Sequence, residues 1–194
     1  MNKIKVIGYY TKNTLYETQA KNLIKSLNEL QLDHDIEGVV STGTWQGNTR
    51  LKAKFIKRML NKHPDYSILY VDADAIVRSK PELLYNINCD VAVRWENFAW
   101  RPNECLSGTI YMANNDKTRS LCDLWDSINK SNNNKKNLEQ WNLGSAIDKM
   151  KDLKTFNLPP EYTFIFDLSR RLYKDAVPVI EHFQASRKVN KNKI

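Results

Sequence analysis

The chain has 194 residues, of which 41% are hydrophobic and 27% are charged, an ordinary composition for a globular domain that makes a second domain unnecessary. The sequence starts with a short strand pattern instead of a signal-peptide segment and has no run long enough to span a membrane, so we expect a cytoplasmic protein. Its three cysteines, Cys89, Cys105 and Cys122, have neither an even count nor a CxxC spacing, which argues against a disulfide framework and a zinc site.

The first part of the chain predicts a strand followed by a helix. Residues 3–10 form a mainly apolar stretch that predicts the strand. Thr14 and Glu17 then have the spacing of a capping box, which marks the start of a helix. The expected helix has one apolar stripe, formed by Ala20, Leu23, Ile24, Leu27 and Leu30.

The same alternation continues along the rest of the chain. Further strands are expected over residues 36–40, 67–72, 91–93 and 109–113. Helices are expected over residues 49–62, after a cap at Ser79, and along the apolar stripe Leu121, Leu124, Trp125 and Ile128. This order predicts an α/β fold, with a mostly parallel, doubly wound sheet in a single domain and its ligand at the carboxyl edge of the strands.

The segment Asp72-Ala73-Asp74 follows a continuous apolar strand of the kind that a parallel sheet covers on both faces. Residues i and i+2 of an extended segment point the same way, so the two carboxylates can converge on one cation, for which Mg2+ or Mn2+ is best suited. The alternative is a strand-end turn, because Asp often caps backbone groups in turns. The three residues taken alone favour neither interpretation.

Five further segments, in order along the chain, favour the metal site. They are residues 45–56, 106–114, 139–142, 158–162 and 180–183. Together with Asp72-Ala73-Asp74 they resemble the nucleotide-sugar glycosyltransferases of the GT-A fold with a DxD motif, in particular the GT8-like group and its small phage and bacterial types. The resemblance implies a Rossmann-like GT-A domain over residues 1–186, followed by a basic tail over residues 187–194.

The resemblance also implies a metal and a donor. In this family the acidic pair holds Mn2+ or Mg2+ against a nucleotide diphosphate, and the metal offsets charge on the leaving group. By this likeness Asp74 is a direct ligand, Asp72 contacts the ribose and reaches the metal through water, and His182 is the third protein ligand. A UDP-sugar is the donor that the family leads us to expect.

Two parts of the chain are expected to hold the nucleotide. In related enzymes the loop after the first strand contacts the base and ribose, and here it carries Tyr9, Tyr10 and Thr11; equally, the two tyrosines can simply finish the strand. Basic side chains bind phosphate oxygens well, which makes candidates of Arg50, Lys52 and Lys54. The alternative for these three is a solvated helix face.

The sugar end of the donor site follows from the later segments. By the resemblance, Ser107, Gly108 and Asn114 line the sugar, and Glu139 or Gln140 lies near the anomeric carbon. A carboxylate there would act as a general base in an inverting enzyme, whereas a retaining enzyme can do without one.

Charge and aromatic residues bear on the acceptor. The net charge of +8 and the pI near 9.3 favour an acidic partner, and we expect DNA with a modified base, or another acidic polymer. The basic tail would contact phosphates, although a frayed terminus is an equal alternative. Trp95, Trp100 and Trp141 can form an aromatic platform for the acceptor or can belong to the core.

Two other function classes compete with a hexosyl- or pentosyltransferase. The basic balance, nine Tyr and five Trp would suit a nucleic-acid-binding module without catalysis, but the acidic pair would repel phosphate unless a metal lies there. A metal-dependent nucleotidyltransferase would use the same carboxylates, but no Gly-rich phosphate loop follows the first strand.

Overall fold

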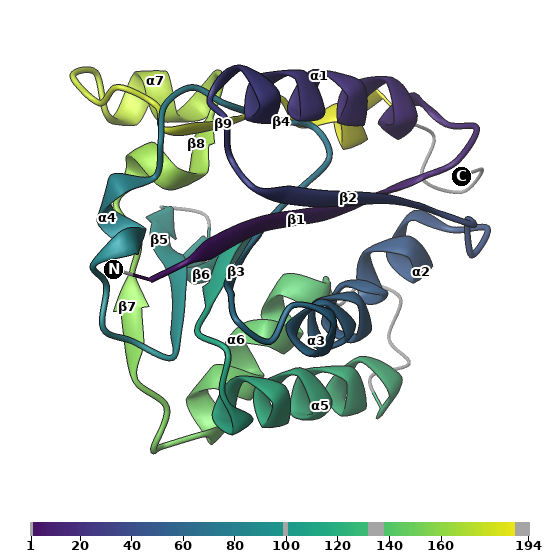
Figure 1. Cartoon of the computed structure of the whole chain (residues 1–194), viewed down its shortest axis with the longest axis vertical. Coiled ribbons are helices and arrows are strands. Elements are labelled where there is room, and N and C mark those ends of the chain that lie inside the picture. The colour runs from purple at the N-terminus through teal and green to yellow at the C-terminus, as the bar shows by residue number, and fades with distance from the viewer. Residues whose placement is uncertain (1, 99–100, 132–137, 189–194) are drawn as a thin grey trace.

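The structure, a computed structural model, describes residues 2–98, 101–131 and 138–188 (Figure 1). Trp100 and residues 189–194 of the expected tail lie outside the described residues. In chain order the elements are β1 (Ile4–Thr11), α1 (Leu15–Glu29), β2 (His34–Val39), α2 (Trp45–Arg50), α3 (Lys52–Lys62), β3 (Ser67–Val71), β4 (Ala75–Val77), α4 (Glu82–Tyr85), β5 (Val91–Phe98), β6 (Arg101–Met112), α5 (Asp116–Ser131), α6 (Glu139–Lys149), β7 (Thr155–Asn157), η1 (Pro160–Thr163), β8 (Phe164–Ile165), α7 (Leu168–Leu172), β9 (Ile180–His182) and η2 (Ala185–Lys188).

A six-stranded sheet in the order β2-β1-β3-β6-β5-β7 divides the molecule. Helix α1 covers one face of this sheet, and α3, α5 and α6 lie on the other (Figure 1). Strand β1 pairs in parallel with β2 and β3, and β5 pairs in parallel with β7, whereas β6 runs antiparallel to both its neighbours. The predicted α/β fold with helices on both faces of the sheet is therefore confirmed, with β6 as the reversed strand.

The apolar stripes predicted for the helices form the two halves of the core. On one face of the sheet, Leu23 and Leu27 of α1 pack with Val6 and Val71. On the other face, residues of α3, α5 and α6 pack against β1 and β3, and Trp125 is fully buried among them. Each large apolar side chain buried in this way contributes about 1.5–3 kcal/mol. No helix among the described residues combines the length and apolarity needed to cross a membrane.

Two helix starts differ from the sequence prediction. The single helix expected over residues 49–62 is two helices, α2 and α3. Helix α2 begins before the expected start, where Thr44 caps it by accepting a hydrogen bond from the Gly47 amide. At the junction, the Leu51 amide donates to the Asn48 carbonyl three residues back, which tightens the turn before α3 begins. Ser79 does not cap α4, since the N-cap residue of this helix is Pro81, which makes no side-chain hydrogen bond.

The β5–β6 hairpin is much longer than the two short strands expected over residues 91–93 and 109–113. Its pairing register shifts between Ala92 and Arg94 and again between Glu96 and Phe98. Each shift changes which side chains face the core, so the alternation that identifies a strand in a sequence is interrupted. Residues 109–112 of β6 pair with β3, and the earlier residues of β6 run past the carboxyl end of β3.

Candidate functional site

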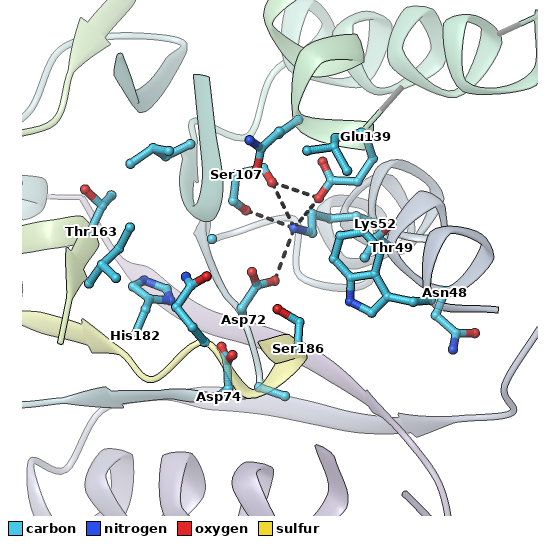
Figure 2. Close-up of a pocket in the computed structure, with 18 of the residues that line it drawn as sticks. Asn48, Thr49, Lys52, Asp72, Asp74, Ser107, Glu139, Thr163, His182 and Ser186 are labelled. Carbon is cyan, nitrogen blue, oxygen red and sulfur yellow. Dashed lines mark hydrogen bonds and ion pairs between the residues drawn. The ribbon is translucent and has the colours of Figure 1, made fainter. Parts of the chain in front are cut away.

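A cleft of about 520 Å³ opens at the carboxyl ends of β1 and β3, between α6, β6 and the segment after β9 (Figure 2). Small-molecule sites in proteins commonly measure about 300–1,000 Å³. Most of the residues predicted for the site line this cleft, namely Tyr9, Tyr10, Thr11, Lys52, Asp72, Asp74, Ser107, Gly108, Glu139, Gln140 and His182. The structure thus brings together residues from six separate parts of the chain.

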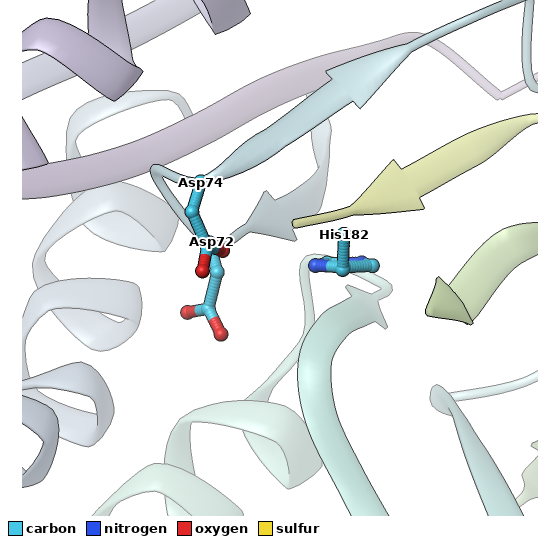
Figure 3. Close-up of side chains that lie close together, drawn as sticks. All are labelled: Asp72, Asp74 and His182. Carbon is cyan, nitrogen blue, oxygen red and sulfur yellow. The ribbon is translucent and has the colours of Figure 1, made fainter. Parts of the chain in front are cut away.

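Asp72, Asp74 and His182 meet on one side of the cleft (Figure 3). One ligand atom from each lies within 4.8 Å of the others. The two carboxylates belong to the turn between β3 and β4, and the antiparallel pairing of β4 with β9 sets Ala75 opposite His182. The small sheet is therefore the element that holds the imidazole beside the acidic pair.

The protonation states in this cluster suit a cation. Burial lowers the pKa of His182 to about 4, so its ring is neutral at pH 7. The ring Nε2 lies 2.9 Å from the Thr109 hydroxyl. This contact fixes the orientation of the ring and leaves Nδ1 as the nitrogen that can bind a cation. Burial, and then the nearby charge of Asp72, raise the pKa of Asp74 to about 6. Bringing a cation here would offset the repulsion between the two carboxylates.

Gly108 provides space between the imidazole and the acidic pair. A Cβ atom at this position would lie 3.0 Å from His182 Cε1, 3.2 Å from His182 Nδ1 and 3.3 Å from Asp72 Oδ2. Glycine keeps this space open between a nitrogen and a carboxylate oxygen. Carboxylates suit Mg2+ and Mn2+, and a neutral imidazole is a better ligand for transition metals. The described residues therefore fit a divalent cation, Mn2+ better than Mg2+.

We predict that Gly108→Ala weakens Mn2+ binding by at least about tenfold, because the new methyl group occupies the space between His182 Nδ1 and Asp72 Oδ2. The measurement is the Mn2+-induced rise in melting temperature, with circular dichroism to verify the fold. An unchanged rise in a folded variant would show that the cation does not bind beside Gly108.

Lys52 lies at the centre of a buried charge network (Figure 2). Its ammonium nitrogen is 2.7 Å from Glu139 Oε1, 3.1 Å from Asp72 Oδ1 and 3.0 Å from the Ser107 carbonyl. Burial opposes the charged form, but Asp72 and Glu139 outweigh it and raise the pKa of Lys52 above its ordinary value. The Lys52 side chain is only 2% exposed, so the solvated-face alternative does not apply to it.

The two carboxylate oxygens of Glu139 differ in their hydrogen bonding. Its Oε1 accepts hydrogen bonds from Lys52 and from the Ser107 hydroxyl at 2.7 Å each. Among the described residues, no group hydrogen-bonds to its buried Oε2. Burial raises the pKa of Glu139 although Lys52 acts against it. Trp125 Nε1 donates to the Glu139 carbonyl at 3.0 Å, so the start of α6 is fixed to α5. A buried acceptor without a partner is costly, which points to a ligand hydroxyl as its partner.

Three predicted residues do not reach the cleft. Asn114 follows β6, and its side-chain amide donates to the carbonyls of Leu60, His63 and Tyr66, so it holds the loop between α3 and β3. Lys54 lies on the exposed face of α3. Arg50, at the end of α2, is not part of the cleft lining.

Tyr9 lines the cleft chiefly as a core residue. Its ring packs against Phe55 and Tyr70, and its hydroxyl donates to the Asn48 carbonyl at 2.7 Å. With a relative exposure of 8%, the ring has little surface on which a base could stack. Tyr10 and Thr11, which also line the cleft, extend the same strand to its end.

The structure adds cleft residues that the sequence analysis missed. Tyr16 and Trp45 come from the starts of α1 and α2, and Thr163 from the end of η1. Arg187, which the sequence analysis assigned to the tail, also lines the cleft, and its guanidinium lies 2.6 Å from Asp167. The basic composition after residue 186 was the available signal for Arg187, and Trp45 begins the family-like segment 45–56; no pattern in the sequence singles out Tyr16 or Thr163.

Comparison with known proteins identifies the fold. No protein-family model matches the chain, and no curated protein does. The structure is similar to that of a glycosyltransferase involved in the glycosylation of the major capsid of PBCV-1, with a TM-score of 0.70 and 14% identity over 93% of this chain and 92% of the other. The fold is that of the GT-A glycosyltransferases.

Two further structures agree with this fold. The glycosyltransferase GlyE of Streptococcus pneumoniae TIGR4 aligns with a TM-score of 0.62 and 16% identity over the whole of this chain, which spans 56% of the length of GlyE. The galactosyltransferase LgtC, in complex with donor and acceptor sugar analogues, aligns with a TM-score of 0.58 and 12% identity over 93% of this chain and 87% of LgtC. At these identities the likeness is one of fold.

Proposed function

We propose that this chain is a metal-dependent glycosyltransferase that moves a sugar from a nucleoside diphosphate donor, in the first place a UDP-sugar, to a hydroxyl acceptor. The observation that carries the proposal is the convergence of Asp72, Asp74 and His182 in a cleft large enough for such a donor. The GT-A fold supports it, because solved structures of this fold include a galactosyltransferase with donor and acceptor analogues. Within the proposal, Asp72-Ala73-Asp74 is the DxD motif of a GT8-like enzyme.

In this proposal the metal is Mn2+ or Mg2+, held by Asp74 and His182 with Asp72 beside them. When bound, the ion supplies charge that stabilises the leaving diphosphate. Asp72 Oδ1 accepts one hydrogen bond from the Tyr70 hydroxyl and faces Lys52, so Oδ2 is the oxygen on the side of His182. The ammonium of Lys52 pairs with Asp72 and Glu139, so it orients these two carboxylates instead of binding phosphate. Arg187 gives the cleft wall a positive charge for the diphosphate.

The residues that line the cleft indicate where the sugar and the nucleotide of the donor bind. Glu139 Oε2 accepts a hydrogen bond from a hydroxyl of the transferred sugar, since it is a buried acceptor that the described residues leave without a partner. Gln140 and Ser107 lie on the same part of the lining. At the other end, Tyr10 and Thr11 contact the base and ribose, with Trp45 close enough to line the same cleft.

A donor-release assay tests the proposal. We expect one sugar nucleotide among UDP-, GDP- and dTDP-sugars to release its nucleoside diphosphate slowly in the presence of Mn2+ or Mg2+, because water can replace the acceptor. EDTA should abolish the release, since the metal offsets charge on the leaving diphosphate. The measurement is free nucleoside diphosphate over time.

Other outcomes of this assay would replace the proposal. Release of nucleoside monophosphate, or transfer of the nucleoside moiety, would favour a nucleotidyltransferase. No release and no donor binding, together with salt-sensitive binding to DNA, would favour a nucleic-acid-binding module.

The proposed acceptor is a hydroxyl compound. Hydroxymethylated DNA belongs in the first acceptor screen, because a net charge of +8 favours a polyanion and residues 187–194 continue the basic sequence. Unmodified DNA of the same sequence is the matched control.

A further inference from the structure

A second hollow lies beside the cleft, on the other side of a hydrogen-bonded pair of side chains. Gln140 Nε2 donates to Glu104 Oε1, and both residues line the cleft. Glu104 also lines the second hollow, which has a volume of about 280 Å³. The two spaces share this wall, so a ligand in the hollow lies next to a ligand in the cleft.

The hollow is formed by α6 and the β5–β6 hairpin. Trp141, Gly144 and Ser145 are spaced three and four residues apart, so they lie on one face of α6. Trp95 of β5 packs closely on this face, because a Cβ atom at Gly144 would lie 3.0 Å from Trp95 Cη2. Glycine thus lets the indole of Trp95 reach the helix. Trp141 has a relative exposure of 42%, so much of its surface is open to solvent.

Two indoles and a few polar groups are suited to a sugar ring. The apolar carbon face of a sugar can stack on an aromatic ring, while its hydroxyls need hydrogen-bond partners. Glu104, Asn103 and Ser145 place such groups in the lining. A volume just below the usual range of about 300–1,000 Å³ for ligand pockets fits one sugar unit better than an extended ligand.

The charge of the hollow disfavours a polyanion. Within the described part of the chain, Glu104 is the one charged residue of the lining, which has no Lys or Arg. Burial, and then the carboxylates of Glu139 and Asp148, raise the pKa of the Cys105 thiol, so this side chain is neutral. The described lining offers no cation to a phosphate group, whereas an uncharged sugar needs only hydrogen-bond partners for its hydroxyls.

We propose that this hollow binds the acceptor, a neutral saccharide that stacks on Trp141 and presents a hydroxyl to the cleft across Glu104 and Gln140. The inference rests on the proposed function, because it takes the cleft to be the donor site. It makes a saccharide the acceptor in place of DNA.

Fluorine NMR of protein labelled with 5-fluorotryptophan tests this assignment. Trp141→Phe identifies the signal of Trp141, and the fully buried Trp125 serves as an internal reference. Methyl β-galactoside, methyl β-glucoside and lactose are the probes, added with and without UDP and Mn2+. We expect at least one of them to shift the Trp141 signal and leave the Trp125 signal unchanged.

A matched pair of variants measures the contribution of the indole. Trp141→Ala should weaken saccharide binding about tenfold, which corresponds to about 1.4 kcal/mol. Phe156→Ala removes an exposed aromatic side chain of similar exposure, 37%, from β7, and should leave the saccharide affinity unchanged. UDP affinity in the presence of Mn2+ is measured for both variants to verify the donor site.

The outcomes separate the two proposals. If UDP binds with Mn2+ but none of the saccharides shifts the Trp141 signal, the acceptor assignment is overturned and the proposed function stands. A shift of the Trp141 signal by a hydroxymethylated DNA oligonucleotide, but not by the saccharides, would overturn it in favour of DNA. If no nucleotide binds, the proposed function fails, and a saccharide at Trp141 would then not be an acceptor.

Discussion

Replacing Lys52 with Met is expected to lower the free energy of unfolding by about 3–5 kcal/mol, the usual cost of removing one partner from a buried ion pair. Lys52 is 2% exposed and faces Glu139, which is 6% exposed, so the variant leaves a buried carboxylate without its cation. Urea denaturation at pH 7, followed by circular dichroism, measures the change.

Two comparisons make the Lys52 result specific. Lys57→Met removes an ammonium at the same distance from a carboxylate, 2.7 Å from Asp123, but this pair is exposed and should cost no more than about 1 kcal/mol. The double variant Lys52→Met with Glu139→Leu should recover part of the lost stability, because it also removes the unpaired charge. Equal losses for Lys52→Met and Lys57→Met would show that the buried network contributes little to the fold.

Replacing Asp74 with Asn is expected to abolish metal-dependent donor release and leave the fold intact. The amide has nearly the shape of the carboxylate, and its oxygen can still accept the hydrogen bond that the Ala185 amide makes to Asp74 Oδ2 at 2.7 Å. The negative charge that attracts a cation is lost. Mn2+ titration calorimetry and the donor-release assay measure the two effects, and an unchanged circular dichroism spectrum verifies the fold.

Asp65→Asn is the matched control for this change, because Asp65 is exposed in the loop between α3 and β3. The control should bind Mn2+ and release nucleotide as the parent does. Ordinary turnover by Asp74→Asn would remove Asp74 from the proposed metal site and reopen the strand-end turn as the explanation of residues 72–74.

Local sequence patterns predicted the fold better than they predicted the contacts of the site. The apolar run of β3 and the acidic pair after it are neighbours in sequence, so their placement follows from strand geometry alone. His182 comes to the same place through the pairing of β4 with β9, which are about 100 residues apart. Only the resemblance to a known family indicated His182, because no local pattern encodes that pairing.

The basic residues show what a closer use of helical spacing would have added. Lys52 lies three and four residues before Phe55 and Ile56, which places it on the buried face of α3, whereas Lys54 lies on the opposite side. This spacing distinguishes the two lysines, although their chemistry does not. The structural role of Asn114 could not be predicted from helical spacing, because its three carbonyl partners belong to a segment whose course depends on the packing of α3.

The pairing of β4 with β9 also sets an order of events during protein synthesis. All strands of the six-stranded sheet lie before residue 158, whereas His182 and the Ala185 amide that contacts Asp74 come afterwards. Domains fold as the chain emerges from the ribosome, N-terminal parts first. A nascent chain can therefore complete its large sheet while the carboxylates of Asp72 and Asp74 still lack the imidazole. The cation site is among the last features to form, after the scaffold that supports it.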